Sequence, residues 1–98
     1  MKYYLCKFIP PRTDFLATMS DVEKDLMKRH GAYLNRLLAE GLIVAHGPVM
    51  DPAGGYGVSL FRIADEQTIE ALTAEDPIVK NGVGHYEHHV MLSLAVGA

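Results

Sequence analysis

The stretch from Ser20 to Gly41, S-D-V-E-K-D-L-M-K-R-H-G-A-Y-L-N-R-L-L-A-E-G, decides how the rest of the chain must be arranged. Ser20 followed by Glu23 is a capping box, in which each side chain bonds a free backbone N–H at the start of a helix. Gly41 suits the position after the last helical turn, where a positive φ favours a residue without Cβ. The sequence therefore predicts one long helix between these two residues.

At about 100° per residue, the predicted helix has one apolar side. That side carries Val22, Leu26, Met27, Tyr33, Leu34, Leu37 and Leu38. His30 falls near the middle of it, where the core is expected. Two interpretations stay open at this point. His30 is either a structural histidine that is hydrogen-bonded within the core, or a functional imidazole that lines a pocket, with its protonation tuned by burial and neighbours.

The size and charge of the chain restrict the kinds of protein it can be. Its 98 residues are enough for one domain, spanning 1–98. A net charge of −3 offers no basic surface for nucleic acid and no polybasic patch for a membrane. The start of the chain shows no signal-peptide pattern, and no segment has the roughly 20 apolar residues of a membrane span. We expect a cytoplasmic protein that binds a small molecule.

Turn signals and alternation divide the remaining chain into short elements. Strands are predicted at 2–9, 42–50, 56–63 and about 84–96, with an irregular turn at 15–19. Pro48 suggests that the second strand lies at an edge or is bulged near its end. Asp65 is the predicted cap of a second helix over 66–75. Asp76 with Pro77 starts a helical turn over 78–81, because Asp is a good N-cap and Pro suits the first helical position.

The resulting order, βαββαβ, is the split-βαβ, ferredoxin-like arrangement of an α+β fold. It predicts a four-stranded antiparallel sheet with helices on one face. The strand at 2–9 is apolar on both sides, and the strand at 84–96 is rich in apolar residues. One layer of helices covers only one face of a sheet, so we expect a homodimer with sheet facing sheet. Such an interface would bury at least about 1,200 Å².

Few residues outside the long helix suggest a reactive site. Four histidines are candidate metal ligands: His46, His85, His88 and His89. However, neighbouring strand residues point to opposite faces, and His85 and His89 would lie about 13 Å apart. Cys6 lies in an apolar strand, where a free cysteine usually acts as a small hydrophobe. No metal is therefore predicted, and His30 with an acidic partner is the best acid–base candidate.

The pattern H-x-x-Y-L-x-x-L-x-x-x-G over His30–Gly41 is followed by Gly47-Pro48 and by D-P-x-V-x-x-G-V over Asp76–Val83. In this order and spacing, the chain resembles the YCII-related proteins. The resemblance implies a ferredoxin-like subunit of a dimeric α+β barrel, akin to muconolactone isomerase and the cofactor-free monooxygenases. It also implies that His30 and Asp76 are the family's paired catalytic residues. The family's best-defined reaction is elimination from a chlorinated, hydroxylated aromatic compound. His85, His88 and His89 lie outside the pattern.

These observations together predict an enzyme of lyase or isomerase type. The carboxylate of Asp76 would orient the imidazole of His30, which would move protons on a small oxygenated compound, cyclic or aromatic. No metal and no organic cofactor are expected. Two alternatives remain: a small-ligand binding domain that does no chemistry, and a cofactor-free monooxygenase. The sequence assigns no role to His46.

Overall fold

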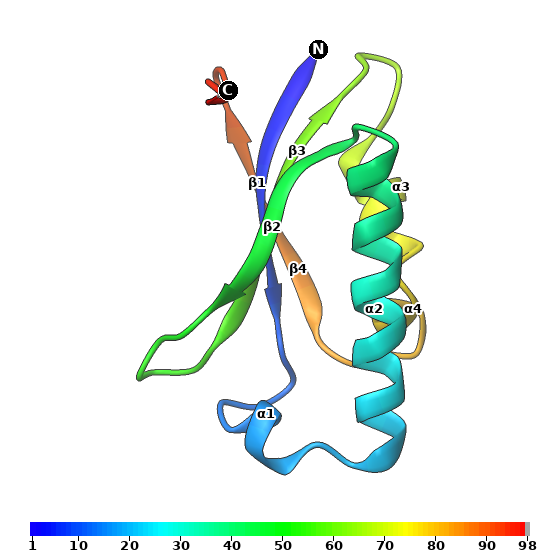
Figure 1. Cartoon of the computed structure of the whole chain (residues 1–98), viewed down its shortest axis with the longest axis vertical. Helices are drawn as coiled ribbons and strands as arrows, with labels where there is room; N and C mark the ends of the chain where they lie inside the picture. Colours follow the sequence, from blue (N-terminus) through cyan, green and yellow to red (C-terminus); the bar gives the residue numbers. More distant parts are fainter. Residues whose placement is uncertain (98) are drawn as a thin grey trace.

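A computed structural model describes residues 1–97 and shows the predicted βαββαβ order with two short additional helices. The elements in chain order are β1 (Lys2–Ile9), α1 (Phe15–Thr18), α2 (Asp21–Ala39), β2 (Ile43–Val49), β3 (Tyr56–Ile63), α3 (Ile69–Ala74), α4 (Pro77–Lys80) and β4 (His85–Met91). The four strands form one antiparallel sheet in the order β2-β3-β1-β4. Helices α2, α3 and α4 cover one face of this sheet (Figure 1). The predicted α+β, ferredoxin-like fold is confirmed.

Helix α2 begins and ends where the sequence predicts. The Ser20 side chain accepts a hydrogen bond from the backbone N–H of Glu23 at 3.1 Å, and the Glu23 carboxylate accepts one from the backbone N–H of Ser20 at 2.9 Å. Gly41 follows the helix with a φ of 81°. The capping box and the glycine stop are both confirmed.

The buried side of α2 is narrower than the predicted apolar side. Leu26, Tyr33, Leu34 and Leu37 are buried, but Val22 is 70% exposed and Leu38 is 41% exposed. The first turn of α2 extends beyond the end of the sheet (Figure 1), so Val22 has no strand beneath it. Leu38 lies at the margin of the apolar arc. The prediction that both face the core is wrong.

The helix predicted over 66–75 is shorter in the structure. Helix α3 starts after Thr68 and covers Ile69–Ala74 only. Asp65 does not cap it and instead forms an ion pair with the amino group of Met1 at 2.8 Å. The carboxamide of Gln67 accepts a hydrogen bond from the backbone N–H of Ala64 at 2.8 Å, which closes a turn where the first helical residues were expected.

The last strand also ends early, at Met91 instead of near Val96. Strand β4 pairs with β1, and Tyr3 opposite Met91 is the final pair of that ladder. Lys2, the next residue of β1, pairs with Ile63 of β3 and not with Leu92, so the ladder between β1 and β4 ends there. Leu92 is accordingly fully exposed.

The connections follow the sequence signals closely. Strand β2 is an edge strand, as Pro48 suggests, although the irregular pairing lies between Ile43 and Ala45, at the beginning of the strand. The segment expected as an irregular turn at 15–19 contains the four-residue helix α1. Asp76 caps α4 by accepting a hydrogen bond from the backbone N–H of Ile78 at 3.2 Å. Within residues 1–97, no helix is long and apolar enough to cross a membrane.

Two apolar clusters lie between the helices and the sheet. The first holds Cys6, Tyr33, Leu34, Leu37, Ile43, Phe61, Ile63 and Ile69, and the second holds Phe8, Phe15, Leu26 and Ile78. Helix α2 contributes Leu34 to the first and Leu26 to the second. His30 lies one helical turn from each of them. Its side chain therefore enters the interior between the two clusters.

Candidate active site

His30 and Asp76 meet in the interior, although 46 positions separate them in the sequence. The Nδ1 atom of His30 lies 2.6 Å from Oδ2 of Asp76. His30 is 7% exposed and Asp76 is 0% exposed. The contact predicted between these two side chains is present.

The position of Asp76 follows from its role as a helix cap. Its Oδ1 accepts the backbone N–H of Ile78, which holds the carboxylate at the start of α4. Its other oxygen, Oδ2, is directed into the interior, where it contacts His30. One short side chain thus caps a helix and contacts His30, each through a different oxygen.

Tyr86 is a third member of this group that the sequence analysis did not find. Its hydroxyl donates to Oδ2 of Asp76 at 2.7 Å, the same oxygen that contacts His30. Burial, followed by the nearby charge of Asp76, raises the pKa of the Tyr86 phenol, so the hydroxyl keeps its proton and remains a donor. The alternation of β4 places Tyr86 on the inner face of the strand, but nothing in the sequence pairs that face with Asp76.

The Asp76 carboxylate therefore has three hydrogen-bond donors. A buried carboxylate is tolerated when such bonds replace its lost hydration. Because an ionised carboxylate only accepts hydrogen bonds, the proton in the contact belongs to Nδ1 of His30. The neutral imidazole is thereby fixed in one tautomer, with Nε2 as its free acceptor. The ring also packs on Phe8, whose centroid lies 4.8 Å away.

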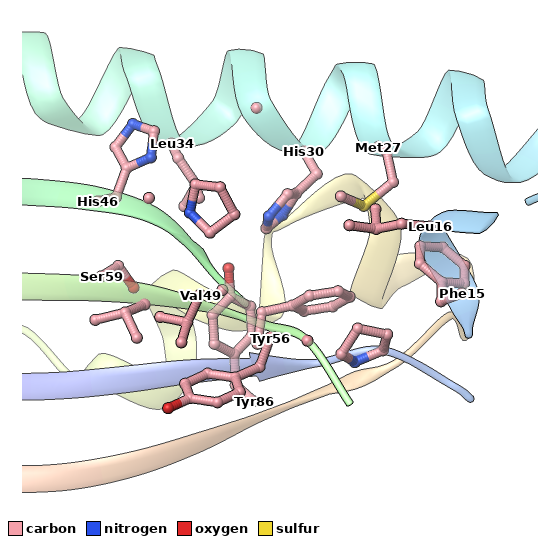
Figure 2. Close-up of a pocket in the computed structure, with 18 residues that line it drawn as sticks. Phe15, Leu16, Met27, His30, Leu34, His46, Val49, Tyr56, Ser59 and Tyr86 are labelled. Atoms are coloured by element: carbon pink, nitrogen blue, oxygen red, sulfur yellow. The ribbon is translucent and has the colours of Figure 1, made fainter. Parts of the chain in front are cut away.

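The imidazole of His30 lines a pocket of about 260 Å³ between α2 and the sheet (Figure 2). Residues from β1, α1, α2, β2, β3, β4 and two connecting segments form the lining: Phe8, Pro10, Phe15, Leu16, Met27, His30, Gly31, Leu34, His46, Gly47, Pro48, Val49, Gly55, Tyr56, Gly57, Val58, Ser59 and Tyr86. Most of these side chains are apolar. An apolar cavity of roughly 150 Å³ already binds benzene, so this pocket has room for a substituted six-membered ring.

The remaining histidines do not gather around one point. His46 lines the pocket and contacts Asn35, whereas His88 contacts the hydroxyl of Thr73 at 2.8 Å. His85 and His89 are exposed on the other face of β4. Among residues 1–97, no group of three or more His, Cys, Asp and Glu side chains is placed to hold a metal ion. Cys6 is buried in the first apolar cluster, and burial raises the pKa of its thiol to about 12.

Comparison with known proteins agrees with this architecture. The YCII-related domain matches residues 1–91. Among solved structures, the fold is similar to that of 5-chloro-2-hydroxyhydroquinone dehydrochlorinase from Burkholderia phenoliruptrix in complex with 2,5-dihydroxybenzoquinone, with a TM-score of 0.62 and 18% identity over 93% of each chain. No curated protein matches the sequence significantly. Because the family match spans nearly the whole chain, this protein belongs to the YCII-related family.

Proposed function

We propose that this protein is a cofactor-independent enzyme of lyase or isomerase type, which moves protons on a small oxygenated aromatic compound. The observation that carries the proposal is the 2.6 Å contact between His30 and Asp76 beside an apolar pocket. The fixed tautomer leaves Nε2 of His30 as a proton acceptor, and the surrounding apolar side chains limit competition from water. The similar dehydrochlorinase acts on a hydroxylated, chlorinated ring, which supports an aromatic substrate class.

The proposed chemistry divides the steps between His30 and Asp76. Nε2 of His30 takes a proton from a ring hydroxyl or from a ring carbon of the substrate. The electron pair left behind moves into the ring. In an elimination, the substrate reacts as its keto tautomer, in which the leaving group is on a saturated ring carbon. The electron pair then expels this group with the electrons of its bond to carbon, and the imidazolium of His30 releases its proton to water. In an isomerisation, the imidazolium returns the proton to a different atom. Asp76 accepts the hydrogen bond from Nδ1 of His30 throughout, and its negative charge stabilises the positive charge that forms on the imidazole.

Substitution of either residue tests this proposal. His30→Ala is expected to lower kcat by about 10²- to 10⁴-fold, the usual contribution of an acid–base residue, while the fold is retained. Asp76→Asn should also lower kcat, yet it keeps a good N-cap for α4. Chloride release from 5-chloro-2-hydroxyhydroquinone, the substrate in the name of the similar enzyme, is a suitable first assay. Lys28→Ala is the control, because Lys28 is an exposed residue of the same helix as His30, outside both the pocket and the open face of the sheet. Full activity of His30→Ala on a turned-over substrate would contradict the proposal.

The two alternative functions make different predictions in the same assay. A binding domain would return the ligand unchanged at any protein concentration. A cofactor-free monooxygenase would consume molecular oxygen with an electron-rich phenol, whereas a lyase would turn over equally well under argon.

We also propose that two copies pair through the open face of the sheet. Tyr3, Leu5 and Leu60 lie on the central strands with their side chains on the face opposite to the helices, and all three are only half-buried. The exposed apolar residues Leu92 and Val96 follow at the end of β4. A second copy would cover this surface, as in the dimeric α+β barrel that the family resemblance implies.

A further inference from the structure

We propose that the Ser59 hydroxyl is a specificity-determining contact of the pocket, which donates a hydrogen bond to a carbonyl oxygen of a cyclic ligand. The pocket would then disfavour a ring of the same shape that carries an apolar group in place of that oxygen. This inference rests on the proposed function, because it takes the pocket beside His30 as the place where the ligand binds.

Ser59 has a buried hydroxyl that bonds nothing in the protein. It lies on β3 between Cys6 of β1 and His46 of β2, lines the pocket and is only 2% exposed. Every fully enclosed side-chain oxygen or nitrogen among residues 1–97 has a hydrogen-bond partner. The Ser59 hydroxyl bonds none of these residues, so its oxygen must be open to the pocket. Figure 2 shows Ser59 beneath His46, at the other end of the view from Phe15.

The two neighbours of Ser59 in the sheet explain why it is unpaired. The thiol of Cys6 is a weak hydrogen-bonding group. The ring of His46 is held by α2 instead, because its Nε2 atom lies 2.8 Å from Oδ1 of Asn35. A buried hydroxyl without a partner is unfavourable. A ligand in the pocket can supply the missing partner.

The two histidines of the pocket present acceptors and no donor. Oδ2 of Asp76 takes the proton of Nδ1 of His30, and Oδ1 of Asn35 takes the proton of Nε2 of His46. In a neutral imidazole, the second nitrogen carries no proton and only accepts. Neither histidine can therefore bond a carbonyl oxygen, which is an acceptor as well.

The two tyrosines of the lining have no hydroxyl to spare for the pocket either. The hydroxyl of Tyr86 already donates to Asp76. The ring of Tyr56 lies 5.0 Å from the amino group of Lys7, whose side chain is on the face of the sheet opposite to the helices. Ser59 is therefore the one side chain of the described lining that can donate to a ligand oxygen.

This difference between donors and acceptors determines which ligands fit. A carbonyl oxygen only accepts hydrogen bonds, so among the side chains of the pocket it finds its partner at Ser59. An apolar group at the same position would displace water from the Ser59 hydroxyl without replacing its hydrogen bond, which weakens binding.

The test compares cyclohexanone with methylenecyclohexane, in which a CH2 group replaces the carbonyl oxygen. Titration of the isotope-labelled protein, followed by NMR, gives both dissociation constants for each variant. Ser59→Ala should shift the ratio of the two constants about five- to tenfold against cyclohexanone, the effect of one hydrogen bond. The comparison of ratios removes the difference between the two compounds in water.

Thr73→Val is the matched control. The Thr73 hydroxyl is also buried, but it lies outside the pocket and contacts the carbonyl oxygen of Ile69 and Nε2 of His88 at 3.1 Å and 2.8 Å. This variant should leave the ratio unchanged. Its urea midpoint should fall, whereas that of Ser59→Ala should not, since only Thr73 loses hydrogen bonds within the protein.

Three results would overturn the inference: a ratio that Ser59→Ala leaves unchanged, no binding of cyclohexanone to wild type, or a urea midpoint that falls as far in Ser59→Ala as in Thr73→Val. Failure of the proposed function gives a different result. In that case His30→Ala would retain turnover, while the ratio would still shift in Ser59→Ala.

Discussion

The geometry of the candidate site depends on one residue, Asp76. It is fully buried, and its oxygens bond His30, Tyr86 and the backbone of Ile78. A charged group at this depth remains stable only while its hydrogen bonds are complete. Each of its partners therefore contributes to the folded state as well as to the orientation of the imidazole.

Two tyrosine substitutions measure that contribution. Tyr86→Phe removes a donor to a buried charge and should lower the free energy of unfolding by about 1.5–3 kcal/mol. Tyr33→Phe is the matched control, because the Tyr33 hydroxyl donates to the neutral carbonyl of Leu72 and should cost about 0.5–1.5 kcal/mol. Urea unfolding of both variants gives the comparison. Equal losses would mean that Asp76 does not depend on the Tyr86 hydroxyl.

At the scale of elements, helix α2 both stabilises the fold and forms one wall of the pocket. At Gly31 these two roles conflict, because a residue that favours the helix would fill part of the pocket. Glycine in a helix interior costs about 1 kcal/mol relative to alanine. Gly31 lines the pocket, and a Cβ added there would meet nothing within 4 Å. The space beside it is part of the pocket. The helix thus gives up intrinsic stability at a point where the ligand would lie.

Gly31→Ala is expected to separate these two effects. The free energy of unfolding should rise by about 0.5–1 kcal/mol, because alanine is the better helix former. Binding of 5-chloro-2-hydroxyhydroquinone, the compound proposed for the first assay, should weaken about fivefold, since the new methyl group occupies pocket volume. Urea unfolding and an NMR titration give the two values. Unchanged affinity would show that the ligand does not reach this part of α2.

The start of α2 is joined to the preceding segment by the ion pair of Arg12 with Glu23. Both guanidinium NH groups contact the carboxylate, at 2.8 Å and 2.7 Å. The hydrogen bond from Arg12, with that from the backbone of Ser20, lowers the pKa of Glu23 from 4.5 to about 2. A carboxyl whose pKa is lower in the folded state stabilises the protein above its unfolded pKa and loses that effect as the pH falls.

Glu23→Gln should therefore be less stable than wild type at pH 7, and the difference should disappear as the pH falls from about 4.5 to about 2. Glutamine can still complete the capping box, so the substitution removes mainly the charge. Asp25→Asn serves as the control, since its exposed pair with Arg29 on the same helix is worth little. Chemical denaturation across this pH range makes the measurement. If the difference in stability between wild type and Glu23→Gln stayed constant down to pH 2, it would not arise from the lowered pKa of Glu23.

At the scale of the whole molecule, the open sheet face predicts the assembly. Light scattering at micromolar concentration should give twice the 10.8 kDa mass of one chain. Leu60→Glu places a charge at the centre of this face and should yield monomers. Lys24→Glu changes the charge of an exposed residue on α2 and should leave the dimer intact. A monomer mass for wild type would refute the proposed pairing.

The sequence by itself determined the features that depend on neighbouring residues. The capping box at Ser20, the glycine stop at Gly41 and the Asp76-Pro77 start of α4 use contacts within one turn, so local spacing predicts them. The order of strands and helices likewise follows from periodicity, and it led to the correct fold. The pairing of His30 with Asp76 came from the family pattern, because no local rule joins two residues 46 positions apart.

The tertiary structure decided what depends on distant partners. Strand β4 stops at Met91 because its ladder with β1 ends at Tyr3, and the strand's own sequence contains no such stop. Val22 is exposed because α2 extends beyond the sheet, which its helical periodicity does not show. Tyr86 reaches Asp76, and His46 reaches the pocket, only because the sheet register brings their strands beneath α2 and α4. Which side chains share a site is set by packing between elements, and a pattern along the chain does not contain that information.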